Sequence, residues 1–147
     1  MRVIGVDFGD VRTGIAVSDE SMFLASGVGT VTAKGLSALA DRIGEYCRMY
    51  GASKIVMGRP RNMDDTAGPR AEKADRFAAI LRERTGLEVI LTDERLTTVE
   101  AHEFLDMTDT RGRKRKKVID TLSAEIILQN WLDGERKKRS ENDNRPI

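Results

Sequence analysis

Three acidic residues stand out because each is expected at the end of a regular element. Asp7 follows the apolar run Val3–Val6, Glu94 follows the strand-like segment Leu87–Leu91, and Asp120 falls in the first turn of an apolar helical pattern. Three converging carboxylates repel one another and persist together only around a cation. Their hard oxygen ligands favour magnesium or manganese, which can activate water and stabilise the leaving oxygen of a phosphodiester.

Each of these acids also has an ordinary structural explanation. Arg12 could neutralise Asp7, because a desolvated carboxylate needs a cationic partner of some kind. Asp120 could simply favour the N-terminus of its helix, and Glu94 could pair with Arg95. The residues alone therefore leave a metal site and a set of local ion pairs as alternatives.

The elements that would carry the acids follow from the hydrophobic periodicity. We expect strands at 3–6, 15–17, 23–31, 54–58 and 87–91, and helices at 35–50, from 69 to near 86, from the capping box at 97–100, and at 118–132. A strand meander followed by strands alternating with helices is typical of an α/β fold with a mixed sheet. Sites in such sheets gather at the carboxyl ends of parallel strands, so Asp7 and Glu94 would meet there if their strands are parallel. Asp93 would then alternate to the opposite side.

The overall composition excludes several classes of protein. At 147 residues the chain suits about one domain. No apolar run approaches the roughly 18 residues of a membrane span, and no export signal begins the sequence, so we expect a cytoplasmic location. The single cysteine, Cys47, excludes an internal disulfide and is expected in the core.

Competing motifs do not support other chemistry. The segment Gly9–Gly14 has the glycine spacing of a phosphate-binding loop, but Ile15 stands where that motif requires lysine. No dinucleotide-binding glycine pattern follows the first strand, and the lone histidine, His102, is expected at the surface without a catalytic role.

The charge is distributed unevenly along the chain. Six basic residues lie within 111–117, and without them 19 basic residues stand against 24 acidic ones. We expect residues 106–117 to be mobile, and Arg113, Lys114, Arg115 and Lys116 to contact a phosphate backbone. The alternative for such a segment is a solvated charge run. The charged residues 135–147 are expected to form a disordered tail behind a single domain over residues 1–134.

Several motifs together resemble the YqgF family of Holliday junction resolvases, which are also described as nucleases of the 16S ribosomal RNA precursor. The resemblance covers residues 2–133 and rests on Asp7-x-Gly9-x-x-Arg12-x-Gly14, Gly58-x-Pro60-x-Asn62-Met63-Asp64, Asp93-Glu94-Arg95-Leu96-Thr97-Thr98, and Lys116-Lys117-x-Ile119-Asp120 with Ile127-Leu128-Gln129. It implies an RNase H-like fold with a five-stranded mixed sheet in the order 3-2-1-4-5, the second strand antiparallel. It also implies a metal-dependent nuclease site that uses Asp7, Glu94 and Asp120 with Mg²⁺ or Mn²⁺.

The function that these inferences favour is an endonuclease of structured nucleic acid, acting on precursor 16S ribosomal RNA rather than on DNA junctions. Arg12, Arg59 and Arg61 would steady phosphates, although Arg59 and Arg61 depart from the apolar residues expected in the family's loop. The alternatives are a resolvase of branched DNA and an inactive nucleic-acid-binding factor. A sugar-kinase-like nucleotide site would need two such domains, and the chain has room for one. The sequence does not distinguish a monomer from a homodimer.

Overall fold

A five-stranded mixed sheet forms the middle of the structure, a computed structural model that describes residues 1–9, 11–59, 68–93 and 112–143. Only the backbone is described at 93, 112–120 and 142–143. The strands are β1 (Arg2–Asp7), β2 (Thr13–Ser18), β3 (Ala25–Val31), β4 (Ala52–Arg59) and β5 (Glu88–Asp93). They lie in the order β3-β2-β1-β4-β5, with β2 antiparallel to both neighbours and β4 parallel to β1 and β5. The expected strand order and directions are therefore confirmed.

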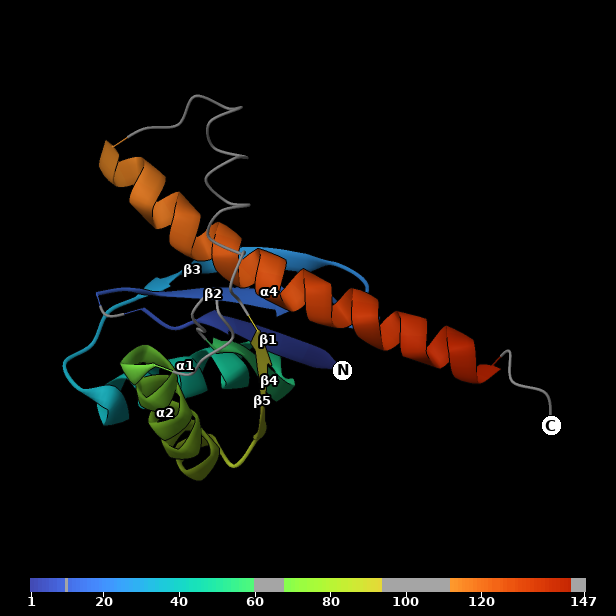
Figure 1. Ribbon diagram of the computed structural model, residues 1–147, viewed down its shortest axis with the longest axis horizontal. Coiled ribbons are helices and arrows are strands. Elements are labelled where there is room, and N and C mark those ends of the chain that lie inside the picture. The colour runs from blue at the N-terminus through green and yellow to red at the C-terminus, as the bar shows by residue number, and fades with distance from the viewer. Residues whose placement is uncertain (10, 60–67, 94–111, 144–147) are drawn as a thin grey trace.

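Helices cover both faces of this sheet (Figure 1). Helices α1 (Leu36–Tyr50) and α2 (Pro69–Thr85) pack on one face, and the long helix α4 (Gly112–Asp143) crosses the other. The sequence determines this division locally, because successive strand residues point to opposite faces. In β1, Ile4 and Val6 enter the core beneath α1 and α2, whereas Val3 enters the core beneath α4.

The ends of α1 and α2 follow from their terminal residues. Pro69 occupies the first turn of α2, where its missing N–H costs nothing. Gly51 and Gly86 end the two helices in the left-handed conformation that glycine adopts readily. Cys47 lies in the core of α1 as expected, and burial raises the pKa of its thiol to about 11.

Helix α4 is longer at both ends than the sequence suggested. Residues 112–117, expected to be mobile, form its first turns, and residues 135–143, expected to be disordered, continue it past Gly134. Lysine and arginine are good helix formers, so a basic run need not interrupt a helix. Beyond Gly134, Arg136 bonds to Asp133 and stacks over the ring of Phe23 at 4.0 Å, which offsets the helix penalty of the glycine.

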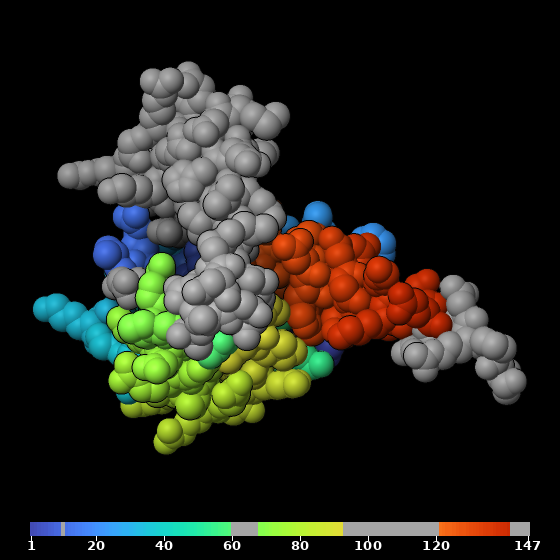
Figure 2. All heavy atoms as spheres, viewed as in Figure 1, coloured from blue at the N-terminus to red at the C-terminus, as the bar shows by residue number. Residues whose placement is uncertain are grey.

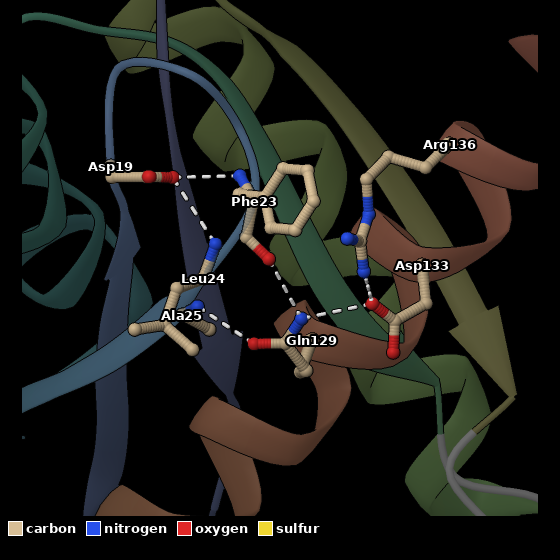
Figure 3. Close-up of polar contacts among 7 residues, drawn as sticks. All are labelled: Asp19, Phe23, Leu24, Ala25, Gln129, Asp133 and Arg136. Atoms are coloured by element: carbon tan, nitrogen blue, oxygen red, sulfur yellow. Dashed lines mark hydrogen bonds and ion pairs between the residues drawn. The ribbon is translucent and has the colours of Figure 1, made fainter.

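The turn before β3 is bonded to the middle of α4 (Figure 3). The Gln129 side chain accepts a hydrogen bond from the amide of Ala25 at 2.8 Å and donates one to the carbonyl of Phe23 at 3.0 Å. Phe23 itself was expected to begin the strand, but β3 starts at Ala25, because the Asp19 carboxylate binds the amides of Phe23 and Leu24 in a turn. The side chain of Gln129 thereby sets the position of α4 along the sheet.

The C-terminal end of α4 extends beyond the rest of the molecule (Figure 2). It does so on the side where the chain begins, away from the carboxyl end of β1 (Figure 1). Among the described residues, no helix combines the length and apolar character needed to cross a bilayer.

Candidate active site

Asp7 lies at the carboxyl end of the central strand, as expected. It is the last residue of β1 and pairs with Gly14 of β2. It has the same parity as Val3 and Gly5, whose face of the sheet is covered by α4. The side chain of Asp7 is partly exposed and lies on the α4 side of the sheet edge.

Helix α4 can approach this face closely because two glycines lie beneath it. A Cβ atom on Gly5 would be 2.7 Å from the Cβ of Leu128, and one on Gly27 would overlap the Thr121 methyl group. Along β3, Ala25 is opposite Gln129 and Gly27 is opposite Thr121. Because β3 runs parallel to β1, the N-terminal half of α4 lies toward the end of the sheet that carries Asp7.

Asp120 directly precedes Thr121 in this half of α4, one helical turn before Ala124. The backbone of residue 120 is therefore placed toward the Asp7 edge of the sheet. The side chain of Asp120 lies outside the described part of the structure.

The third acid, Glu94, lies just beyond β5 and outside the described residues. The strand that leads to it ends at the same edge as β1, since β1, β4 and β5 are mutually parallel neighbours. Within β5, Val89 and Leu91 belong to the core beneath α1 and α2, whereas Ile90 packs in the α4 core. Asp93 has the parity of Val89 and Leu91 along the strand, and its side chain lies outside the described part of the structure.

No cluster of three or more metal-binding side chains occurs within the part of the chain that the structure describes. That part holds one of the three expected ligands in full, namely Asp7. The chemistry of the complete set, carboxylate oxygens alone, suits a hard divalent cation. Asp7 and Arg12 both have interaction partners in the structure, so the ion-pair alternative stays open.

Arg59 is held by an aspartate that no sequence pattern indicated. Its Nε and Nη2 atoms donate to the two carboxylate oxygens of Asp75 on α2, at 2.8 and 3.0 Å. These bonds hold the pKa of the Asp75 carboxyl below its ordinary value and raise the pKa of Arg59. Arg59 also has the parity of Ile55 and Met57, so it lies on the α2 side, opposite the side of Asp7. No local pattern links residues 59 and 75, because the helix that carries Asp75 reaches Arg59 only in the folded chain.

The other predicted phosphate-binding residues are described less fully. Arg12 lies in the β1–β2 turn and is partly exposed. Arg61 lies outside the described residues, as does His102. For the basic segment containing Arg113, Lys114, Arg115 and Lys116, the structure describes a helical backbone but no side chains.

Comparisons with known proteins agree on one family. A family model described as "RuvX: Holliday junction resolvase" matches residues 1–134. A protein of Pelotomaculum thermopropionicum named "Putative pre-16S rRNA nuclease" is 44% identical over 142 residues, covering 96% of this chain and 92% of its own. A protein of the same name from Geobacillus kaustophilus is 45% identical over 139 residues, covering 92% and 100% of the two chains.

A solved structure shares the fold at low sequence identity. RuvC of T. thermophilus, in complex with Holliday junction substrate, superposes with a TM-score of 0.58 at 14% identity, covering 93% of this chain and 96% of that one. The fold is therefore RNase H-like, as the motifs implied.

Proposed function

Because the chain belongs to the RuvX family of nucleases, described as Holliday junction resolvases, we propose that it is a metal-dependent endonuclease of structured nucleic acid. Its substrate is the 5′ end of precursor 16S ribosomal RNA, in keeping with the names of relatives that it matches over most of their length. An enzyme that acts on this RNA works in the cytoplasm. Residues 1–134 constitute its nuclease domain.

One structural observation carries this proposal. The carboxyl ends of β1, β4 and β5 meet at one edge of the sheet, Asp7 lies there on the α4 side, and the N-terminal half of α4 lies toward the same edge. Glu94 follows β5 with the parity of Ile90, and Asp120 precedes Thr121. Two independent elements therefore lead to the neighbourhood of Asp7, each with one carboxylate.

The chemistry assigned to the site follows from its ligands. Asp7, Glu94 and Asp120 would hold Mg²⁺ or Mn²⁺, which when bound supplies an activated water and stabilises charge on the phosphodiester oxygens.

Arg12 lies in the turn directly after Asp7 and would orient the phosphate backbone. Arg59 would contribute a phosphate contact only by sharing its guanidinium with Asp75. Arg61 and the basic segment at the start of α4 would bind flanking phosphates.

Cleavage of branched DNA is the second candidate, favoured by the structural match to a resolvase with its junction. The two substrates are distinguished by incubating the purified full-length protein with a precursor 16S RNA fragment or a four-way DNA junction, in Mg²⁺ and in Mn²⁺. We expect metal-dependent cleavage of the RNA at a defined position, and a preference for the junction would assign the alternative function.

The site is tested with the variants Asp7→Asn, Glu94→Gln and Asp120→Asn, each of which we expect to reduce cleavage to background while remaining folded. Double variants should be barely worse than single ones, because residues that act as a unit are not additive. Asp41→Asn is the matched control, since Asp41 is an exposed acid on α1 whose partner is Arg84. Wild-type cleavage by a folded single variant would remove that residue from the site. If the protein binds both substrates and cleaves neither, it is a nucleic-acid-binding factor without nuclease activity.

A further inference from the structure

A cavity of about 200 Å³ lies beside the candidate active site, on the opposite side of the sheet edge. Phe8, which follows Asp7, lines one wall of the cavity. Val31 at the end of β3 and Leu36 and Leu39 of α1 line another. Thr13 and Lys73 add polar groups. The space corresponds to roughly seven water molecules, which is too small for a duplex and suits a single ring-sized group.

The aromatic wall of the cavity is held rigidly from behind. The ring of Phe8 stacks on that of Phe77 with 4.5 Å between centroids and 26° between planes. Phe77 is fully buried in α2, whereas Phe8 is partly exposed. An aromatic side chain fixed in this way is preorganised for stacking against a nucleobase, and such stacking tolerates any base because every base has a π-face.

Two groups of positive character border the cavity. The ammonium group of Lys73 lies 5.7 Å from the centroid of the Phe8 ring. The N-terminus of α1 adjoins the cavity at Gly35 and Leu36, and its first turn has neither a side-chain cap nor an acidic residue. The first amides of a helix lack partners within the helix and carry partial positive charge. None of the described residues that line the cavity is acidic.

We propose that this cavity is a nucleotide subsite, which receives one unstacked nucleotide of the substrate strand while a neighbouring phosphodiester lies at Asp7. The base contacts Phe8 and the apolar wall of Val31 and Leu39, and its phosphate lies toward Lys73 and the start of α1. This inference rests on the proposed nuclease function. The two sites adjoin each other, because Asp7 and Phe8 are consecutive residues that lie on opposite sides of the sheet at the end of β1. The enzyme would thereby select strands that have an unpaired nucleotide next to the cleavage position.

Binding is tested directly, without cleavage, by NMR titration of the full-length protein with adenosine 5′-monophosphate, adenosine and inorganic phosphate as three separate probes. We expect the monophosphate to shift the amide signals of Val31, Leu36 and Leu39 with a Kd near the millimolar range. Lys73→Gln should weaken the binding of the monophosphate at least about tenfold, as expected for the loss of a charged hydrogen bond. The same change should weaken the binding of adenosine much less. Leu36→Trp, which fills the cavity, should abolish the shifts by both nucleoside probes. Met49→Trp places the same side chain at an exposed position of α1 and should change nothing.

Cleavage kinetics separate failure of the subsite from failure of the nuclease function. Leu36→Trp should raise KM for a substrate with an unpaired nucleotide and change kcat much less, whereas Asp7→Asn should abolish cleavage. If Asp7→Asn is inactive but Leu36→Trp cleaves like the wild type and no probe shifts the cavity amides, the subsite is wrong and the nuclease function stands. If the monophosphate binds in the cavity but no metal-dependent cleavage is detected, the nuclease function fails, and the subsite's role in cleavage fails with it.

Discussion

Two partners are compatible with the Asp7 carboxylate, and they predict opposite effects on stability. If Asp7 converges with Glu94 and Asp120, the metal-free protein contains mutual repulsion, so Asp7→Asn should melt above the wild type in chelator. If Asp7 instead neutralises Arg12, the same change leaves a guanidinium without its partner and the variant should melt lower. We expect the first outcome, against the trend that most substitutions destabilise.

Added metal provides the control for that measurement. Mg²⁺ or Mn²⁺ should raise the melting midpoint of the wild type. At 100 times its Kd the metal adds about 2.7 kcal/mol to the free energy of unfolding, and Asp7→Asn should respond less. A lower-melting variant together with a wild type that ignores both metals would rule out the metal site.

Asp19 shows how one carboxylate can organise a turn. It accepts hydrogen bonds from the Ser21 hydroxyl at 2.6 Å and from the amides of Phe23 and Leu24 at 2.7 and 3.2 Å. These bonds, the one from Ser21 foremost, lower the pKa of Asp19 to about 2. Because the folded pKa lies below the unfolded value near 3.9, the stability contributed by Asp19 is present above about pH 4 and is lost as the pH falls toward 2.

An NMR titration of the Asp19 carboxyl carbon checks this pH dependence. We expect a midpoint near 2 in the wild type. Ser21→Ala should raise the midpoint toward the ordinary aspartate value, because it removes the largest contribution. A wild-type midpoint close to 4 would contradict the hydrogen-bonded turn.

The approach of α4 to the sheet depends on Gly27, where any side chain would meet the Thr121 methyl group. We expect Gly27→Ala to destabilise the protein by about 1–3 kcal/mol, as overpacking does, and to reduce cleavage because Thr121 adjoins Asp120. Thr121→Ser removes the methyl group and should restore most of the stability in the double variant. Urea unfolding and cleavage assays of the two single variants and the double variant measure this coupling. Additive losses would show that the methyl contact does not set the position of α4.

The basic segment that begins α4 is expected to bind phosphates although its backbone is helical. Changing Arg113, Lys114, Arg115 and Lys116 to Gln preserves helix propensity and removes four charges. The log–log dependence of nucleic-acid affinity on salt should become shallower by a few units, since each phosphate contact on duplex DNA contributes about −0.9. Replacing Lys137, Lys138 and Arg139 near the other end of the same helix is the control and should leave the slope unchanged. An unchanged slope in the first variant would indicate a solvated charge run.

For the molecule as a whole, the structure continues past the point where the family match ends. The match stops at residue 134, whereas α4 runs to Asp143 and Arg136 covers Phe23. Removing residues 137–147 should leave the melting temperature and activity unchanged. Removing residues 135–147 also removes Arg136 and should lower the melting temperature by about 2–4 °C, the effect of losing roughly 1 kcal/mol. Arg136→Ala in the full-length chain should reproduce that loss. Thermal melts of the three proteins compare their melting temperatures.

Local patterns in the sequence determined most of the elements and the choice of acids. The short apolar run Val3–Val6 placed Asp7 at a strand end, and Pro69 and Gly86 marked the ends of α2. These features depend on neighbours within a few residues, so periodicity and capping residues reveal them. The order of the sheet came from a family resemblance, because pairing between distant strands leaves no local pattern.

Only the tertiary structure decided the features that join distant parts of the chain. The pairing of Arg59 with Asp75, the anchoring of Gln129 to the turn before β3, and the cavity between Phe8 and α1 each bring together residues from separate elements. Arg136 shows the same principle, since its contact with Phe23 supports a helix beyond Gly134, where helix propensity alone predicts an end. Packing and pairing between distant residues stabilise these features by more free energy than local helix propensities supply, so tertiary contacts decide the outcome.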